Sequence, residues 1–154
     1  MDCIFCQIVN QTAPSHRIWE DDKHLAFLSI FPNTPGFSVV IPKQHYPSYA
    51  FDLPDGVLAD LAIAAKKVGK LLDAAFDDVA RTGMMFEGYG VDHVHAKLFP
   101  MHGTGRDSAF KPLSSKVDKF FAHYEGYLSS HDWQRADDAA LAELAARIRA
   151  TARA

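Results

Sequence analysis

The chain has 154 residues, of which 48% are hydrophobic and 23% charged, and its formal net charge is -3. This length and apolar content suit one globular domain that buries its own core without disulfide bonds. The weak negative charge argues against a nucleic-acid coat or a basic membrane-binding surface, so we expect neither nucleic acid nor membrane as a partner.

We expect no signal peptide, because Met1 to Cys6 lack a basic region followed by a hydrophobic one. No segment approaches the roughly 18 uninterrupted apolar residues of a membrane-spanning helix. We therefore expect a cytoplasmic protein. In that reducing compartment two cysteines are thiolates or metal ligands rather than a structural disulfide.

The first part of the chain predicts a short helical turn and three strands. Residues 3–10 form the helical turn, and the alternating segments 16–20 and 24–30 form a hairpin around a polar turn at residues 21–23. After a turn-rich loop, residues 37–42 are β-branched and end in proline, which is typical of a buried strand.

From residue 54 the apolar spacing changes from two to three and four. This spacing predicts one long amphipathic helix over residues 54–80, with Asp52 as its N-cap. A strand over residues 82–87 and a glycine-broken turn lead into a second strand, and further helices are predicted at 114–129 and 137–151. We expect an α+β fold with an antiparallel sheet. Residues 1–110 would form the main domain, and residues 111–154 a helical extension packed on it.

The segment from Asp92 to Pro100 carries the strongest functional pattern. With a period of two, one face of a strand is polar and consists of His93, His95 and Lys97, whereas the other face consists of Val94, Ala96 and Leu98. Aligning two imidazoles and an ammonium is costly unless they bind an anion, a metal or a reacting group. A neutral imidazole can attack phosphorus. The alternatives are two half-buried histidines bonded to backbone carbonyls, and a solvated Lys97.

Cys3 and Cys6 form a second candidate site. A C-x-x-C pair suits tetrahedral zinc when two further ligands come from elsewhere in the chain. Two other interpretations stay open: a thiol redox pair, which lacks its expected βαβ context, and two ordinary buried cysteines.

Several separated motifs share one order and spacing with a known family. They are Cys3-Ile4-Phe5-Cys6, Leu25-Ala26-Phe27-Leu28, the segment from Val39 to His45, and His93-Val94-His95-Ala96-Lys97-Leu98-Phe99. Over roughly residues 3–101 the chain resembles bacterial members of the histidine-triad (HIT) family, whose pattern is His-φ-His-φ-His-φ-φ with φ apolar. Lysine stands in place of the third histidine.

The resemblance implies a HIT-like fold with about five antiparallel strands and one long helix, and a homodimer. It also implies a nucleotide hydrolase or nucleotidyl transferase that cleaves at the α-phosphate of a nucleoside polyphosphate, dinucleoside polyphosphate or phosphoramidate. His95 would be the nucleophile that forms a nucleotidyl-histidine, and His93 would orient it. The alternative is a nucleotide- or zinc-binding regulatory module with reduced or no turnover.

By the same resemblance, a structural zinc ion would be held by Cys3, Cys6, His45 and His93. Lys97 would bind the non-bridging phosphate oxygens or the leaving group, since lysine offers a fixed charge and three donors. His102, in the loop that follows, would replace the missing imidazole.

The expected nucleotide pocket departs from the family pattern. Ser29 stands where members usually carry an aspartate for the ribose, and the phosphate-binding loop is shorter, without its asparagine and hydroxyl. Gly88 and Gly90 would let backbone N–H groups approach a phosphate. The residues that could form an apolar slot for the base, although a core role suits each equally, are Phe5, Ile8, Ile18 and Phe27.

Overall fold

The computed structural model describes residues 3–107, 109–114, 120, 122–125 and 134–152. In this part of the chain five antiparallel strands form one sheet in the order β1-β2-β3-β5-β4. The strands are β1 (His16–Glu20), β2 (His24–Leu28), β3 (Ser38–Pro42), β4 (Thr82–Met85) and β5 (Ala96–Pro100). The helices are α1 (Ile4–Val9), α2 (Asp55–Ala75) and α3 (Asp138–Thr151), with a 3-10 turn at Ala50–Asp52.

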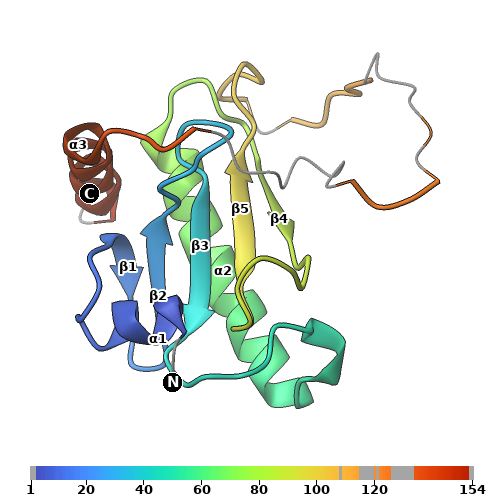
Figure 1. Cartoon of the computed structure of the whole chain (residues 1–154). Coiled ribbons are helices and arrows are strands. Elements are labelled where there is room, and N and C mark those ends of the chain that lie inside the picture. Colours follow the sequence, from blue (N-terminus) through green and yellow to red (C-terminus); the bar gives the residue numbers. More distant parts are fainter. Residues whose placement is uncertain (1–2, 108, 115–119, 121, 126–133, 153–154) are drawn as a thin grey trace.

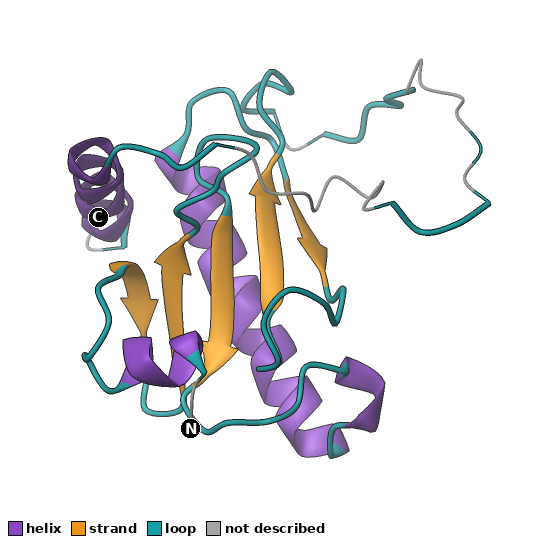
Figure 2. Cartoon of the chain, in the orientation of Figure 1, coloured by secondary structure: helices purple, strands orange, loops and turns teal. Residues whose placement is uncertain are grey.

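The long helix α2 runs along one face of the sheet, and the short helix α1 lies at the other face, over one end of the strands (Figures 1 and 2). Each face therefore has its own core. On the α2 face, Leu61, Val68 and Leu72 pack against strand residues such as Val40 and Leu98, and helix α3 adds Leu141, Ala145 and Ile148. On the α1 face the core consists of Phe5, Ile8, Leu25, Phe27, Phe37, Val39 and Ile41.

Strand β5 lies between β3 and β4, and its register places the candidate site. Val39 of β3 and Met85 of β4 are both paired with Lys97. Because cross-strand partners point to the same face, Lys97 shares the face of Val39, which belongs to the α1-side core. The histidines immediately before β5 therefore lie at the end of the strands that α1 covers.

The structure confirms the predicted α+β class, the antiparallel sheet and the C-terminal helix. Helix α2, however, ends at Ala75 rather than at residue 80, because Phe76 adopts an extended conformation. Asp52 is not the N-cap: it lies in the 3-10 turn, and Pro54 caps α2 without a side-chain hydrogen bond.

The predicted helix over 114–129 falls mostly outside the described residues. Those that are described in this range, 114, 120 and 122–125, are not helical.

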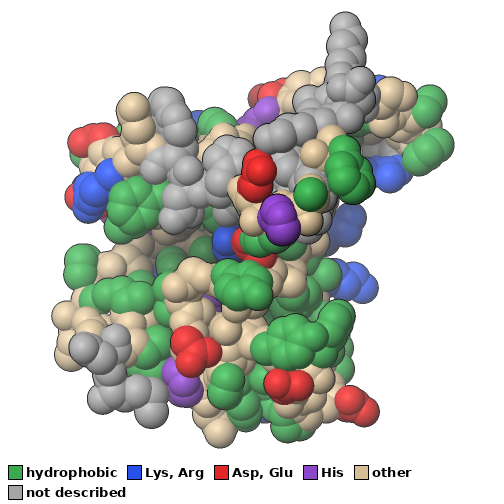
Figure 3. Space-filling model, turned by 45° about the vertical axis from the view of Figure 1, so that its right-hand side comes forward, with side chains coloured by type: hydrophobic (Ala, Val, Ile, Leu, Met, Phe, Trp, Pro, Cys, Tyr) green, Lys and Arg blue, Asp and Glu red, His purple; other side chains and the backbone are tan. Residues whose placement is uncertain are grey.

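None of the helices in the described segments has both the length and the apolar content to cross a bilayer. On the face drawn in Figure 3, the described acidic and basic side chains are scattered among apolar and neutral groups instead of gathering into one charged patch.

Candidate functional site

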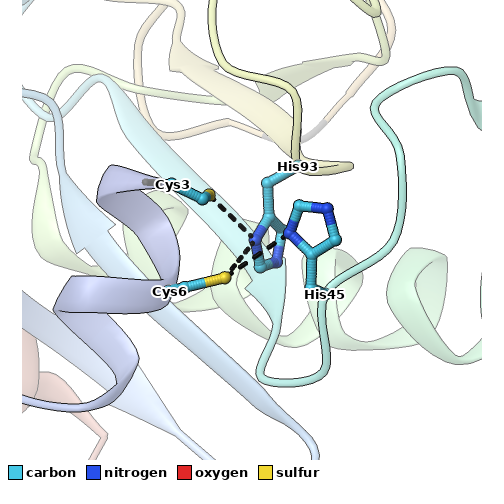
Figure 4. A group of neighbouring side chains, drawn as sticks. All are labelled: Cys3, Cys6, His45 and His93. Carbon is cyan, nitrogen blue, oxygen red and sulfur yellow. Dashed lines mark hydrogen bonds between the residues drawn. The ribbon is translucent and has the colours of Figure 1, made fainter. Parts of the chain in front are cut away.

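Two cysteines of the short helical segment and two histidines from two other segments point toward one another (Figure 4). Cys3 and Cys6 lie at the start of α1, His45 lies in the loop after β3, and His93 lies just before β5. Their ligand atoms all lie within 4.8 Å of one another. The structure thus brings together the four residues that the family resemblance implied as metal ligands.

The spacing of these donors fits tetrahedral zinc. Zinc–sulfur and zinc–nitrogen bonds of about 2.3 and 2.0 Å place neighbouring donors of a tetrahedron roughly 3.4–3.8 Å apart. The Cys6 Sγ–His45 Nδ1 distance is 3.4 Å, and His93 Nδ1 lies 3.6 Å from Cys3 Sγ and 3.7 Å from Cys6 Sγ. Four protein donors would leave no open coordination position, as in structural zinc sites.

His93 is held in the tautomer that a metal ligand needs. Its side chain is fully buried, and its Nε2–H donates to the carbonyl oxygen of Pro42 at 2.8 Å. The proton therefore lies on Nε2, and the Nδ1 lone pair faces the thiols. Burial lowers the pKa of His93, which keeps the ring neutral at pH 7.

Backbone contacts tie the two histidine segments together beside the cluster. Val94 N–H donates to the carbonyl of Tyr46 at 2.9 Å, and Ser48 N–H donates to the Asp92 carboxylate at 2.9 Å. The hydrogen bond from Ser48 also lowers the pKa of Asp92, so this carboxyl group stays ionised and remains a hydrogen-bond acceptor. The chain itself thus holds the His45 loop against the segment that carries His93.

The His95 ring is oriented by a hydrogen bond to the backbone. Its Nδ1–H donates to the carbonyl oxygen of His93 at 2.7 Å, which places the lone pair on Nε2. In the described part of the chain no group donates a hydrogen bond to that Nε2. The side chain of Phe5 packs edge-on against the ring, with centroids 5.3 Å apart. Burial lowers the pKa of His95, so the imidazole is neutral and nucleophilic near pH 7.

His93 and His95 match both the functional interpretation of the H-x-H pattern and the alternative of buried histidines bonded to backbone carbonyls. Each ring does bond a backbone carbonyl, as the non-functional alternative expects. In each case, however, that bond uses one nitrogen and orients the other, toward the thiols for His93 and as an open lone pair for His95. Both rings are also almost completely buried, with 0% and 5% of their surface exposed, rather than lying on an open polar face.

Lys97 is not a solvated charge. Its Nζ lies 2.7 Å from a carboxylate oxygen of Glu87, and the two side chains are only 12% and 11% exposed. Sequence reasoning missed Glu87. The register could have indicated it, because Met85 is paired with Lys97 and Glu87 lies two residues further along, on the side of His95.

The predicted base slot is divided between the two faces of the sheet. Phe5, Ile8 and Phe27 belong to the α1-side core, on the face where Phe5 contacts His95. Ile18 belongs to the core under α2, on the opposite face, so its predicted role in nucleotide binding is wrong. Ser29 follows β2, and its hydroxyl accepts a hydrogen bond from the N–H of Phe31 at 3.2 Å.

Gly88 and Gly90 lie in the loop between β4 and the histidines. Their φ angles are +81° and +92°, a left-handed conformation that favours glycine. The hydroxyl of Ser48 donates to the Gly88 carbonyl at 2.9 Å, which joins this loop to the segment after His45.

The structure does not bring His102 to the histidine pair. His102 follows the C-terminal end of β5, whereas His95 precedes its first residue. Both ring nitrogens of His102 are occupied, one by the Asp78 carboxylate at 3.0 Å and the other by the Pro35 carbonyl at 2.8 Å. This corrects the expectation that His102 replaces the third imidazole.

Comparisons with known proteins agree with this geometry. A family model of the HIT domain matches residues 10–104. The chain is 55% identical over 128 residues to an uncharacterized HIT-like protein of Borreliella burgdorferi, covering 77% of this chain and 91% of that protein. It is 35% identical over 98 residues to the adenosine 5'-monophosphoramidase HNT1 of Saccharomyces cerevisiae, covering 64% and 61% respectively.

Solved structures show the same fold. A HIT family member from Bacillus subtilis has a TM-score of 0.60 and 26% identity, and covers 79% of this chain and 88% of that one. A Zn-bound histidine triad family protein from Mycobacterium smegmatis has a TM-score of 0.69 at 23% identity, and covers 98% and 93%. The chain therefore belongs to the HIT family, as a member that carries lysine at the third position of the triad.

Proposed function

We propose that this protein is a HIT-type nucleotide hydrolase or nucleotidyl transferase that acts through a covalent His95 intermediate. Its substrate would be a nucleoside polyphosphate, a dinucleoside polyphosphate or a nucleoside phosphoramidate. One observation carries the proposal: the hydrogen bond from His95 Nδ1–H to the His93 carbonyl leaves the Nε2 lone pair as the reactive atom. The similarity to a protein named as an adenosine 5'-monophosphoramidase supports this substrate class.

The reaction has two displacements at phosphorus. The Nε2 lone pair of His95 attacks the α-phosphorus, and the bond from phosphorus to the leaving nitrogen or oxygen breaks, with its electron pair going to the leaving group. A leaving nitrogen takes up a proton from solvent and departs as the amine, and the proton released by water in the second step returns to solvent. Water then attacks the same phosphorus, releases His95 and yields the nucleoside monophosphate. The positive charge on the ring in the intermediate is stabilised by the His93 carbonyl that accepts from Nδ1.

The other site residues have supporting roles. Cys3, Cys6, His45 and His93 would hold zinc, which when bound supplies a rigid cross-link rather than a reactive water. Because the His93 carbonyl accepts the hydrogen bond from His95 Nδ1–H, fixing His93 on zinc would also fix the position of the His95 ring. Lys97 would contact the non-bridging oxygens or the leaving group. Phe5, Ile8, Phe27, Ser29, Gly88 and Gly90 would line the nucleotide site.

Replacement of His95 tests the proposal directly. In His95→Ala we expect hydrolysis of adenosine 5'-phosphoramidate to disappear, while zinc content and circular dichroism stay as in the wild type. Ala96→Gly, at the next residue, is a control for backbone disturbance on the apolar face. If the His95→Ala variant hydrolyses the substrate at the wild-type rate, His95 is not the nucleophile.

A binding module with little or no turnover is the second candidate. The departures from the family pattern favour it: lysine replaces the third histidine, and Ser29 stands where members usually carry an aspartate. Calorimetry with AMP distinguishes the two: binding without turnover of any of the three substrate classes supports the module. If instead the zinc site is the function, metal removal would abolish activity outright rather than mainly lower the melting temperature. A cytoplasmic location and a homodimer stay predictions.

A further inference from the structure

Glu87 and Lys97 form a nearly buried ion pair on the face of the sheet that carries His95. Lys97 is paired with Val39, a residue of the α1-side core, and the same core includes Phe5, which contacts the His95 ring. Two residues of extended chain separate Lys97 from His95, a spacing of about 7 Å. The ammonium therefore lies where the third histidine of a HIT triad stands.

The carboxylate of Glu87 is itself held from the other side. One oxygen faces Lys97 Nζ at 2.7 Å, and the other accepts a hydrogen bond from the hydroxyl of Tyr124. The ring of Tyr124 stacks on Tyr89, in the glycine loop, with centroids 6.2 Å apart. Tyr124 lies beyond residue 104, where the match to the HIT domain ends. A residue outside that domain thus supports the site.

A lysine can replace a histidine here only if its position is fixed. Its four-carbon side chain is flexible and its charge is permanent, whereas an imidazole is short, rigid and neutral. A carboxylate partner removes the problem of flexibility, because it holds the ammonium in one position and orients its remaining donors. At 11% exposure Glu87 is itself costly to bury as an unpaired anion, so it needs the ammonium in turn.

We propose that Glu87 is a positioning residue: its carboxylate, supported by Tyr124, fixes the Lys97 ammonium beside His95 in the place of the third histidine. This proposal rests on the proposed nucleotidyl-transfer function. In it, Lys97 contacts the phosphate and Glu87 acts only through Lys97. Binding of the substrate then need not weaken when Glu87 is lost, but the transition state loses an oriented donor.

The test is steady-state hydrolysis of adenosine 5'-phosphoramidate by the full chain. Glu87→Gln keeps the size of the side chain and should lower kcat by about 10-fold or more, the effect of a misplaced catalytic group, without raising KM. In a Lys97→Met background the same substitution should have no further effect on kcat. Glu20→Gln is the matched control, because Glu20 pairs with Lys43 at the same 2.7 Å distance outside the site.

Tyr124→Phe gives an independent measurement, and because Tyr124 is 46% exposed we expect the replacement to leave folding intact. Loss of its hydrogen bond should lower kcat by about 2- to 10-fold. An unchanged kcat in Glu87→Gln or in Tyr124→Phe would overturn the proposal, and so would an equal loss from Glu87→Gln in the wild-type and Lys97→Met backgrounds. If the wild type itself neither hydrolyses the phosphoramidate nor binds AMP, the proposed function fails, and this proposal fails with it.

Discussion

Loss of one zinc ligand should destabilise the whole fold, because the cluster joins segments that are distant in sequence. Cys6 and His45 are 39 residues apart, and a cross-link closes the loop between them. The loop-closure entropy of a cross-link over such a loop corresponds to about 4 kcal/mol at 25 °C. For a chain of this size each kcal/mol shifts the melting temperature by roughly 2–4 °C. Cys6→Ser should therefore melt roughly 8–16 °C below the wild type.

The assay is thermal unfolding followed by circular dichroism, together with metal analysis of the purified protein. We expect one zinc per wild-type chain and none in Cys6→Ser. A chelator should lower the melting temperature of the wild type to that of the variant, but leave the variant unchanged. Thr12→Ala, which alters an exposed residue just after α1, controls for local disturbance. A wild type that holds zinc but melts at the same temperature as Cys6→Ser would refute the cross-link argument.

Two further predictions concern histidines. Because burial lowers the pKa of His95, the unfolded chain takes up a proton at a higher pH than the folded chain does. The contribution of His95 to the free energy of unfolding should be complete above the unfolded-state pKa of about 6.5. It should decrease as the pH falls below that value. Urea unfolding at pH 5.5 and 7.5 checks this, and equal stability at both would contradict it. His102→Ala should leave kcat/KM for the phosphoramidate unchanged, since His102 bonds Asp78 and Pro35 at the far end of β5. A drop comparable to that of His95→Ala would place His102 in the site after all.

The alternation of side chains around His93 predicted correctly which residues face which core. Val94, Ala96 and Leu98 lie under α2, and the histidines face α1. Ile18 was included in the base slot for its apolar side chain alone, and the structure places it in the core under α2. The pairing of β1 with β2 shifts between Arg17 and Trp19, and both Ile18 and Trp19 pack against that core.

The metal ligands and the partner of Lys97 needed more than local patterns. The spacing between Cys3 and Cys6 indicated zinc, but His45 was identified only by resemblance to a family. Glu87 was missed because its contact with Lys97 depends on the register of β4 against β5. His102 is close to His95 in sequence, yet the extended strand between them separates the two rings.

The most direct test of the central claim is to trap the covalent intermediate. Wild-type protein is mixed with a phosphoramidate that carries a labelled adenylyl group, quenched within one turnover, digested at alkaline pH and analysed by mass spectrometry. We predict an adenylyl group on the peptide that contains His95, and none in His95→Ala. Turnover in the wild type with no label on that ring would contradict the mechanism.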